Sequence, residues 1–266
     1  MSMEVHHPHH HGKKNIKEYF LEFFMLFLAV SLGFLAENIR ERYVEEERAH
    51  ELLESFIHDV QSNVQLLDSL ITMNEFSVMK NDSAMLYLME NTEVELDSFY
   101  NFLPVSSYRY LNNNDTYDQM KSSGSLRYIK DSVLLRKIIK YNNTSKAAEF
   151  RSVTQEFEYV SHEYTEAIQK WMPGEIAIKR HVDPYFRSSF KILLKTEKQK
   201  TLMTKLQGYS QNKDFMIGGN ELKQLKKELI PVIARKAFLM SASERFMTNT
   251  LDLAKDLLEY YEKQSH

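Results

Sequence analysis

The N-terminal part of the chain changes from apolar to charged with no helix-breaking residue between the two parts. The stretch from Glu18 to Phe56 reads EYFLEFFMLFLAVSLGFLAENIRERYVEEERAHELLESF. Residues 23–36 carry no charged side chain, and neither glycine nor proline occurs between Gly33 and Pro104. The pattern predicts one long helix that is apolar on every face at its start and solvated further along.

Such an apolar run suits a core helix, a cleaved export signal or a membrane anchor. It is somewhat shorter than the ~20 residues of a typical span. We favour an anchor because the run has no polar face, because Phe34 stands where a cleavage site needs a small residue, and because cations flank it. Those cations are Lys13, Lys14, Lys17, Arg40 and Arg42. We predict a His/Lys-rich tail over 1–17 and an uncleaved transmembrane helix over 18–36, with Glu22 reaching the headgroup zone.

Beyond the anchor, apolar residues alternate spacings of four and three. They are Leu53, Ile57, Val60, Val64, Leu67 and Ile71. This rhythm is typical of a helix–helix seam. It has two interpretations: the core face of one helix within the chain, or a self-pairing coiled coil that makes a homo-oligomer. We predict a juxtamembrane helix over 37–80, a break near Asn81–Ser83, and a helical soluble domain over 81–266.

The rest of the chain predicts further helices. Asp115 suits a helix N-cap, either Asp131 or Ser132 suits the next one, and Gly124 suits a left-handed helix end. Helices are also expected over 149–171 and 193–208, with a loop containing His181 between them, and Pro231 either starts a helix or kinks a longer one. The four-three rhythm returns in a stripe expected to pack on the juxtamembrane helix or the bundle: Met240, Ser243, Met247, Thr250, Ala254, Leu257 and Tyr261.

Composition agrees with a mainly α fold. Seven glycines and five prolines in 266 residues favour long helices over turn-rich β structure. The net charge of -3 shows no excess of the basic residues that bind nucleic acid, so no nucleic-acid partner is expected. The absence of cysteine excludes disulfides, thiolate metal sites and a cysteine nucleophile.

Candidate chemistry is sparse. His162 and Glu163 begin like a zinc-protease helix, but Glu166 replaces the second histidine ligand. No catalytic or cofactor-binding residue is predicted, and no cofactor. The tail histidines are the one metal candidate: their imidazoles suit Zn²⁺, Ni²⁺ or Cu²⁺, unless the tail is inert. They are His6, His7, His9, His10 and His11.

Two stretches carry a resemblance. The anchor with ENIRERYVEEERAHELLESF, and YDQMKSSGSLRYIKDSVLLRKIIKY, are similar to a family of uncharacterised single-pass membrane proteins abundant in Bacteroidota. The matching element comprises Tyr117, Lys121, Ser122, Ser123, Gly124, Leu126 and Ile129. The resemblance implies a short tail, one hydrophobic helix, a charged juxtamembrane helix and a helical domain, and it implies no reaction.

These observations leave three functional hypotheses. The favoured one is a non-enzymatic, membrane-anchored helical protein for scaffolding, assembly or partner binding in the bacterial envelope. The alternatives are a membrane-anchored sensor and a membrane-tethered enzyme with a non-standard site. The expected location is the bacterial inner membrane, with the tail in the cytoplasm and the helical domain in the periplasm. The expected partners are the lipid bilayer and either a second copy or an envelope protein.

Overall fold

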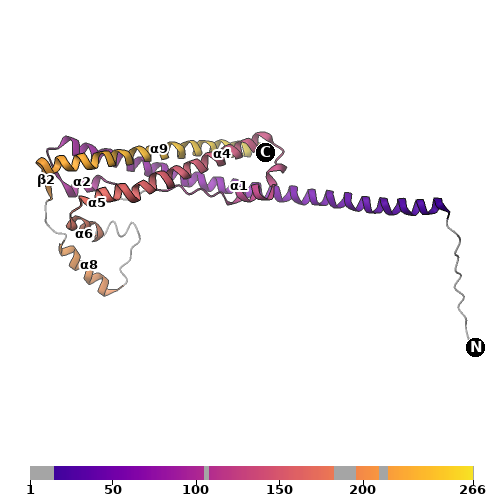
Figure 1. Cartoon of the computed structure of the whole chain (residues 1–266), viewed down its shortest axis with the longest axis horizontal. Helices are drawn as coiled ribbons and strands as arrows, with labels where there is room; N and C mark the ends of the chain where they lie inside the picture. Colours follow the sequence, from indigo (N-terminus) through magenta and orange to yellow (C-terminus); the bar gives the residue numbers. More distant parts are fainter. Residues whose placement is uncertain (1–14, 105–107, 183–195, 210–214, 266) are drawn as a thin grey trace, which may run out of the picture.

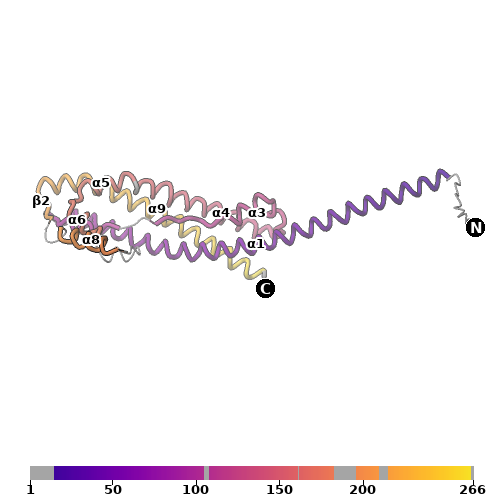
Figure 2. Tube along the Cα trace, turned by 90° about the horizontal axis from the view of Figure 1, so that it is seen from below, coloured from indigo at the N-terminus to yellow at the C-terminus, as the bar shows by residue number. Residues whose placement is uncertain are grey.

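The computed structural model describes residues 15–104, 108–182, 196–209 and 215–265. Its longest helix, α1 (Ile16–Glu90), has 75 residues, which corresponds to about 110 Å. The first part of α1 projects from the rest of the protein, and the second part lies in an elongated helical bundle (Figures 1 and 2). The predicted mainly α fold class is confirmed.

Two further rods complete the bundle. One consists of α4 (Ser132–Phe150), the π-helical segments η2 (Arg151–Phe157) and η3 (Val160–Tyr164), and α5 (Thr165–Lys170). The other is α9 (Gly219–Ser265), which packs along both α1 and α4. Pro231 lies inside α9, so the longer-helix alternative is correct; its exposed position keeps the ring out of the core.

Short elements close the two ends of the bundle. α3 (Asp115–Ser123) and the 3-10 turn η1 (Ser125–Tyr128) contact α1 near the projecting helix. At the other end lie α2 (Leu96–Phe102), α6 (Gly174–Val182) and α8 (Glu197–Tyr209), as Figure 1 shows. There β1 (Glu93–Glu95) pairs antiparallel with β2 (Met216–Gly218), which joins the end of α1 to the start of α9.

The bundle interior consists of three apolar clusters along its length. The cluster nearest the projecting helix contains Phe56, Val60, Met120 and Ile138; the middle one Leu67, Tyr110 and Met247; the far one Leu88, Phe99, Leu225 and Ile233. Val60, Leu67 and Leu88 of α1 each have no exposed surface. Burial of these side chains, at about 25 cal/mol per Å² of apolar area, is what holds α9 against α1.

A buried asparagine fixes the segment before α3. The Asn63 Nδ2 of α1 donates to Asn112 Oδ1, to the Asn113 carbonyl and to the Tyr141 hydroxyl of α4, each at 3.0 Å. The Asn113 backbone N–H donates back to Asn63 Oδ1 at 3.1 Å. Because a buried amide that loses its partners costs about 1–3 kcal/mol, this network holds the segment in one register between α1 and α4.

Several local predictions are confirmed. Gly124 ends α3 with φ of 75°, the left-handed conformation that favours glycine. Asp131 caps α4 by accepting from the backbone N–H groups of Val133 at 2.7 Å and Leu134 at 3.1 Å. The C-terminal stripe from Met240 to Leu257 is buried as predicted, while Tyr261 is half-buried.

Other local predictions are wrong. α1 continues through Asn81–Ser83 to Glu90, because Asn81 is buried and its side chain contacts Met240 Sδ and the Ser77 carbonyl within the bundle. The helix therefore continues across the predicted boundary at residue 80, and its buried side chains begin at Ala49. The N-cap of α3 is Asn114, one residue before Asp115.

Two helices at the end of the bundle away from the projecting helix, α6 and α8, have other boundaries than predicted. His181 lies in α6, whose last residue is Val182, where a loop was expected. The helix expected over 193–208 is α8, Glu197–Tyr209, and residues 193–195 lie outside the described residues.

Candidate functional site

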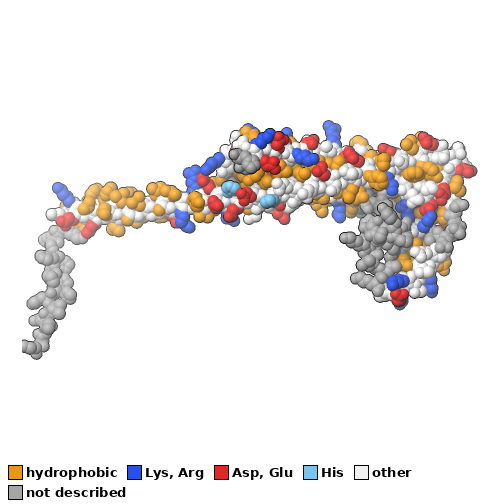
Figure 3. All heavy atoms as spheres, turned by 180° about the vertical axis from the view of Figure 1, so that it is seen from behind, with side chains coloured by type: hydrophobic (Ala, Val, Ile, Leu, Met, Phe, Trp, Pro, Cys, Tyr) orange, Lys and Arg blue, Asp and Glu red, His pale blue; other side chains and the backbone are white. Residues whose placement is uncertain are grey.

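The apolar first part of α1 has no packing partner among the described residues. Its most apolar 18-residue window has a mean hydropathy of 2.0, and none of it is buried. Phe20 and Phe34 are 68% and 70% exposed. Figure 3 shows apolar side chains over this bare helix. Among the described residues, α1 is the one helix long and apolar enough to cross a membrane. Such a surface needs another apolar environment to cover it.

A charged neck joins this part of α1 to the bundle. Residues 37–48 precede the first buried side chain of α1, Ala49, and span about 18 Å at the helical rise. Within the neck, Arg40 Nη2 lies 2.6 Å from Glu37 Oε1, and Arg42 Nε lies 3.3 Å from Glu46 Oε1. These pairs along one helix stabilise it by a few tenths of a kcal/mol each, so the neck extends as a solvated helix.

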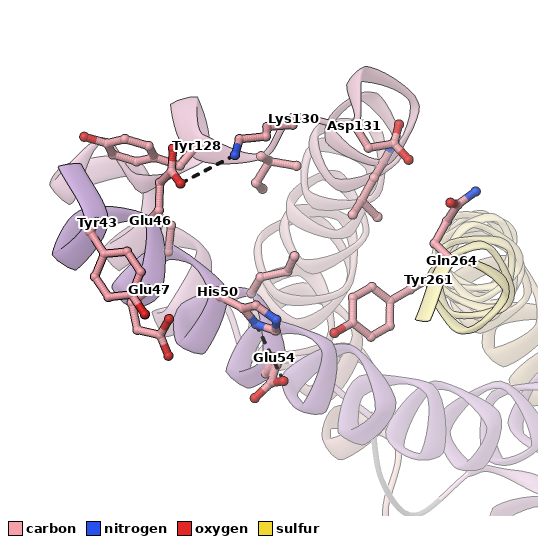
Figure 4. A pocket seen from close by; sticks show the side chains of 14 residues that line it. Tyr43, Glu46, Glu47, His50, Glu54, Tyr128, Lys130, Asp131, Tyr261 and Gln264 are labelled. Carbon is pink, nitrogen blue, oxygen red and sulfur yellow. Dashed lines mark hydrogen bonds and ion pairs between the residues drawn. The ribbon is translucent and has the colours of Figure 1, made fainter. Parts of the chain in front are cut away.

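A hollow of about 750 Å³ opens where the neck meets the bundle (Figure 4). We call it the membrane-proximal hollow. One wall is α1, the second is the turn that leads into α4, and the third is the C-terminal end of α9. The side chains around it include Tyr43, Glu46, Glu47, His50 and Glu54 of α1, Tyr128, Lys130 and Asp131 of the second wall, and Tyr261 and Gln264 of α9.

Two of the four carboxylates that line the hollow, Glu46 and Asp131, link one wall to another. Glu46 accepts from Arg42, and its other oxygen lies 3.5 Å from Lys130 Nζ; Arg42 and then Lys130 lower the pKa of Glu46. The Asp131 carboxylate accepts from the Tyr260 hydroxyl at 2.8 Å, which lowers the pKa of Asp131. The described residues include no group of three or more His, Asp or Glu side chains that could hold a metal ion.

A second polar region lies inside the bundle. Five polar side chains from three elements are each at most 1% exposed: Asn74 and Asn81 of α1, Glu156 of η2, and Lys236 and Ser243 of α9. We call them the buried polar layer. Asn74 Nδ2 donates to the Met240 carbonyl at 2.9 Å, and Asn81 Nδ2 contacts Met240 Sδ at 3.5 Å. Met240 lies one helical turn from both Lys236 and Ser243, so the layer crosses the bundle.

The two ionisable groups of this layer are not paired by hydrogen bonds. Neither carboxylate oxygen of Glu156 has a hydrogen-bond partner in the described protein. Burial raises the pKa of Glu156 to about 7. The Ser243 side chain, which lies near the carboxylate without meeting hydrogen-bond geometry, and the Lys236 ammonium act in the opposite direction. The Lys236 ammonium lies over the Tyr164 ring, 4.1 Å from its centroid, and burial lowers the pKa of Lys236 to about 8. Shifts of this kind mark functional sites and buried structural pairs alike.

The structure places the predicted seam in the interior of the bundle. Val60 and Leu67 have no exposed surface, Ile57 is 5% exposed, and Leu53, Val64 and Ile71 are half-buried. The buried residues of α1 that follow the four-three spacing lie to one side of the predicted stripe. They are Phe56, Val60, Asn63, Leu67, Leu70 and Asn74. The intramolecular interpretation accounts for this burial because α9 covers the stripe. The tail histidines lie outside the described residues.

Sequence reasoning missed the buried polar layer. One signal was available: Asn74, Ser77 and Asn81 continue the four-three rhythm of α1 beyond Leu70. Polar residues at core positions of a seam indicate a buried polar contact. Glu156 gave no such signal, because it lies in a polar-rich stretch where a buried carboxylate looks like any solvated one.

Comparison with known proteins adds no further assignment. The chain matches no protein-family model, no curated protein and no solved structure.

Proposed function

We propose that this chain is a single-pass membrane protein whose helical bundle binds partners or supports assembly in the bacterial envelope, without catalysis. The observation that carries the proposal is the fully exposed apolar part of α1, continuous with a folded bundle. A bilayer is the environment that would cover about 30 Å of apolar helix while leaving the charged neck in water.

The proposed location is the inner membrane, with the tail in the cytoplasm and the bundle in the periplasm. Cations do not decide the orientation, since Lys13, Lys14 and Lys17 before the span match Arg40, Arg42 and Arg48 after it. A short tail with lysines beside an apolar run behaves as a signal anchor, and long domains cross largely regardless of their charge. The resemblance to the Bacteroidota family supports the same arrangement.

Partner binding is proposed at the membrane-proximal hollow. A photo-crosslinking amino acid at Glu47, which lines the hollow, is expected to give a discrete adduct in native membranes. The matched control is Ser55, which is exposed on the same helix and does not line the hollow. Isolation of the Glu47 adduct then identifies the partner by mass spectrometry. Equal, diffuse labelling from both positions would contradict a partner at this surface.

The same hollow supports a second candidate function, a membrane-anchored sensor. One wall of the hollow is α1 itself, from Tyr43 onward, so a small molecule bound there would contact the same helix that forms the proposed span. A binding site of that kind biases a helix only through differential affinity for two arrangements. A molecule that protects Glu47→Cys from maleimide, without competing with the crosslinked partner, would favour the sensor.

A further inference from the structure

The buried polar layer combines charge, burial and irregular helix in one place. Glu156 lies in η2 and Tyr164 ends η3, the two π-helical segments that interrupt the rod from α4 to α5. π-helical segments are rare and occur frequently at functional sites. We propose that Glu156 and Lys236 form a proton-operated switch that sets how tightly α9 packs on this π-helical rod. The inference goes beyond the proposed function and holds whatever the bundle binds.

Hydrogen bonding gives the first reason. The buried polar atoms without a hydrogen-bond partner at this layer are Asn74 Oδ1, Asn81 Oδ1, both Glu156 oxygens and the Tyr164 hydroxyl. All but the tyrosine hydroxyl are acceptors when Glu156 is ionised. A proton on Glu156 neutralises a buried carboxylate and converts one of its two unpaired acceptor oxygens into a donor. Proton uptake therefore improves both the electrostatics and the hydrogen bonding of the folded bundle.

The surroundings of the pair contain few other groups that titrate near neutral pH. From α9, Lys236 and Ser243 face Glu156; from η3, Tyr164 faces Lys236. Burial raises the pKa of Tyr164, and the Arg180 guanidinium of α6 together with Tyr159 and Tyr100 acts on the same ring. α1 contributes the uncharged amides of Asn74 and Asn81. Glu244 of α9 also accepts from Asn74 Nδ2 at 3.2 Å, and burial raises its pKa. Substitution of Glu156 alone therefore separates the contribution of the proposed pair from that of Glu244.

The sign of the pH dependence follows from the two shifts. The pKa of Glu156 rises from 4.5 to about 7 on folding, so its contribution to stability is present at low pH and is lost as pH rises through 7. The pKa of Lys236 falls from 10.5 to about 8, so its contribution is present at high pH and is lost as pH falls through 8. The bundle is therefore least stable between pH 7 and 8, and mild acid strengthens its packing.

The test uses the full chain in detergent micelles with His162 and His181 replaced by glutamine, which removes both imidazoles. Lowering the pH from 7.5 to 5.5 is expected to reduce the unfolding equilibrium constant about twentyfold more in this protein than in its Glu156→Gln variant. Glu163→Gln is the matched control: Glu163 lies in the neighbouring π-helical segment, is exposed and pairs with Arg235 at 3.1 Å. The control should retain the pH dependence.

The single tryptophan supplies a second measurement that needs no variant at position 156. Trp171 Nε1 donates to Glu228 at 2.8 Å and so reports on contact between α5 and α9. Hydrogen bonds led by that from Lys170 hold the pKa of Glu228 at about 2, so this carboxylate does not titrate in the same range. We expect the Trp171 emission to shift with a midpoint near pH 7. An unchanged emission, or the same pH dependence of unfolding with Glu156→Gln, would overturn the proposal.

Discussion

Val60→Asp is expected to unfold the bundle. Val60 has no exposed surface and packs in the cluster that contains Phe56, Met120 and Ile138. Its replacement removes about 1.5–3 kcal/mol of apolar burial. It also places a carboxylate without a partner in the core, which costs several kcal/mol more. We expect a loss of about 5 kcal/mol or more in the free energy of unfolding, which is as large as the whole stability of a marginally stable domain, about 5 kcal/mol.

Circular dichroism of the full chain in detergent micelles, followed during heating, measures this effect. Val44→Asp is the matched control, because Val44 lies on the same helix, is 50% exposed and precedes the bundle. Its effect should stay within about 0.5 kcal/mol. A Val60→Asp protein that keeps its helical content and melting temperature, and only changes its oligomeric state, would show that the stripe pairs two copies.

Removal of residues 1–36 is expected to release nearly all of the protein into the soluble fraction with the bundle intact. No side chain of α1 before Ala49 is buried in the bundle, so the deletion removes no core contact. The charged neck then becomes a solvated helical extension. Helical content and melting temperature in buffer are the readouts. A truncated chain that stays with the membrane, or that is released unfolded, would contradict the separation of anchor and bundle.

The full chain expressed in parallel is the control for that deletion. It should resist extraction by alkaline carbonate and high salt, conditions that remove proteins held only by surface charge. Release of the full chain by carbonate would place the apolar helix on the membrane surface or in a partner's groove.

The helix caps, the helix ends and the spacing of apolar residues were predictable from the sequence. Gly124 and Asp131 act through backbone geometry that depends on a few neighbours, so their roles follow from residue type and position. The C-terminal stripe from Met240 was predictable for a similar reason, because a spacing of four and three places side chains on one face of any helix. The exposed apolar start of α1 has the simplest signal, a run with no polar face.

Tertiary contacts account for what the sequence did not predict. The polar stretch Asn81–Ser83 suggested a break because it interrupts the apolar pattern with poor helix formers, but α1 continues through it, and Asn81 is buried against Met240. The predicted seam does not coincide with the fully buried stripe of α1, because Asn63 and Asn74 are core residues that an apolar pattern omits. The burial of Glu156 and Lys236 depends on two rods that are distant in sequence, and no local pattern encodes it.

Whether α1 crosses a bilayer is the central question, and the absence of native cysteine permits a direct measurement. Single cysteines replace Ser2, before the apolar helix, and Ser241, which is exposed on α9. Intact cells and permeabilised cells are treated with a membrane-impermeant maleimide. We predict labelling at 241 but not at 2 in intact cells, and labelling at both after permeabilisation. Equal labelling of the two positions in intact cells would contradict a single transmembrane pass.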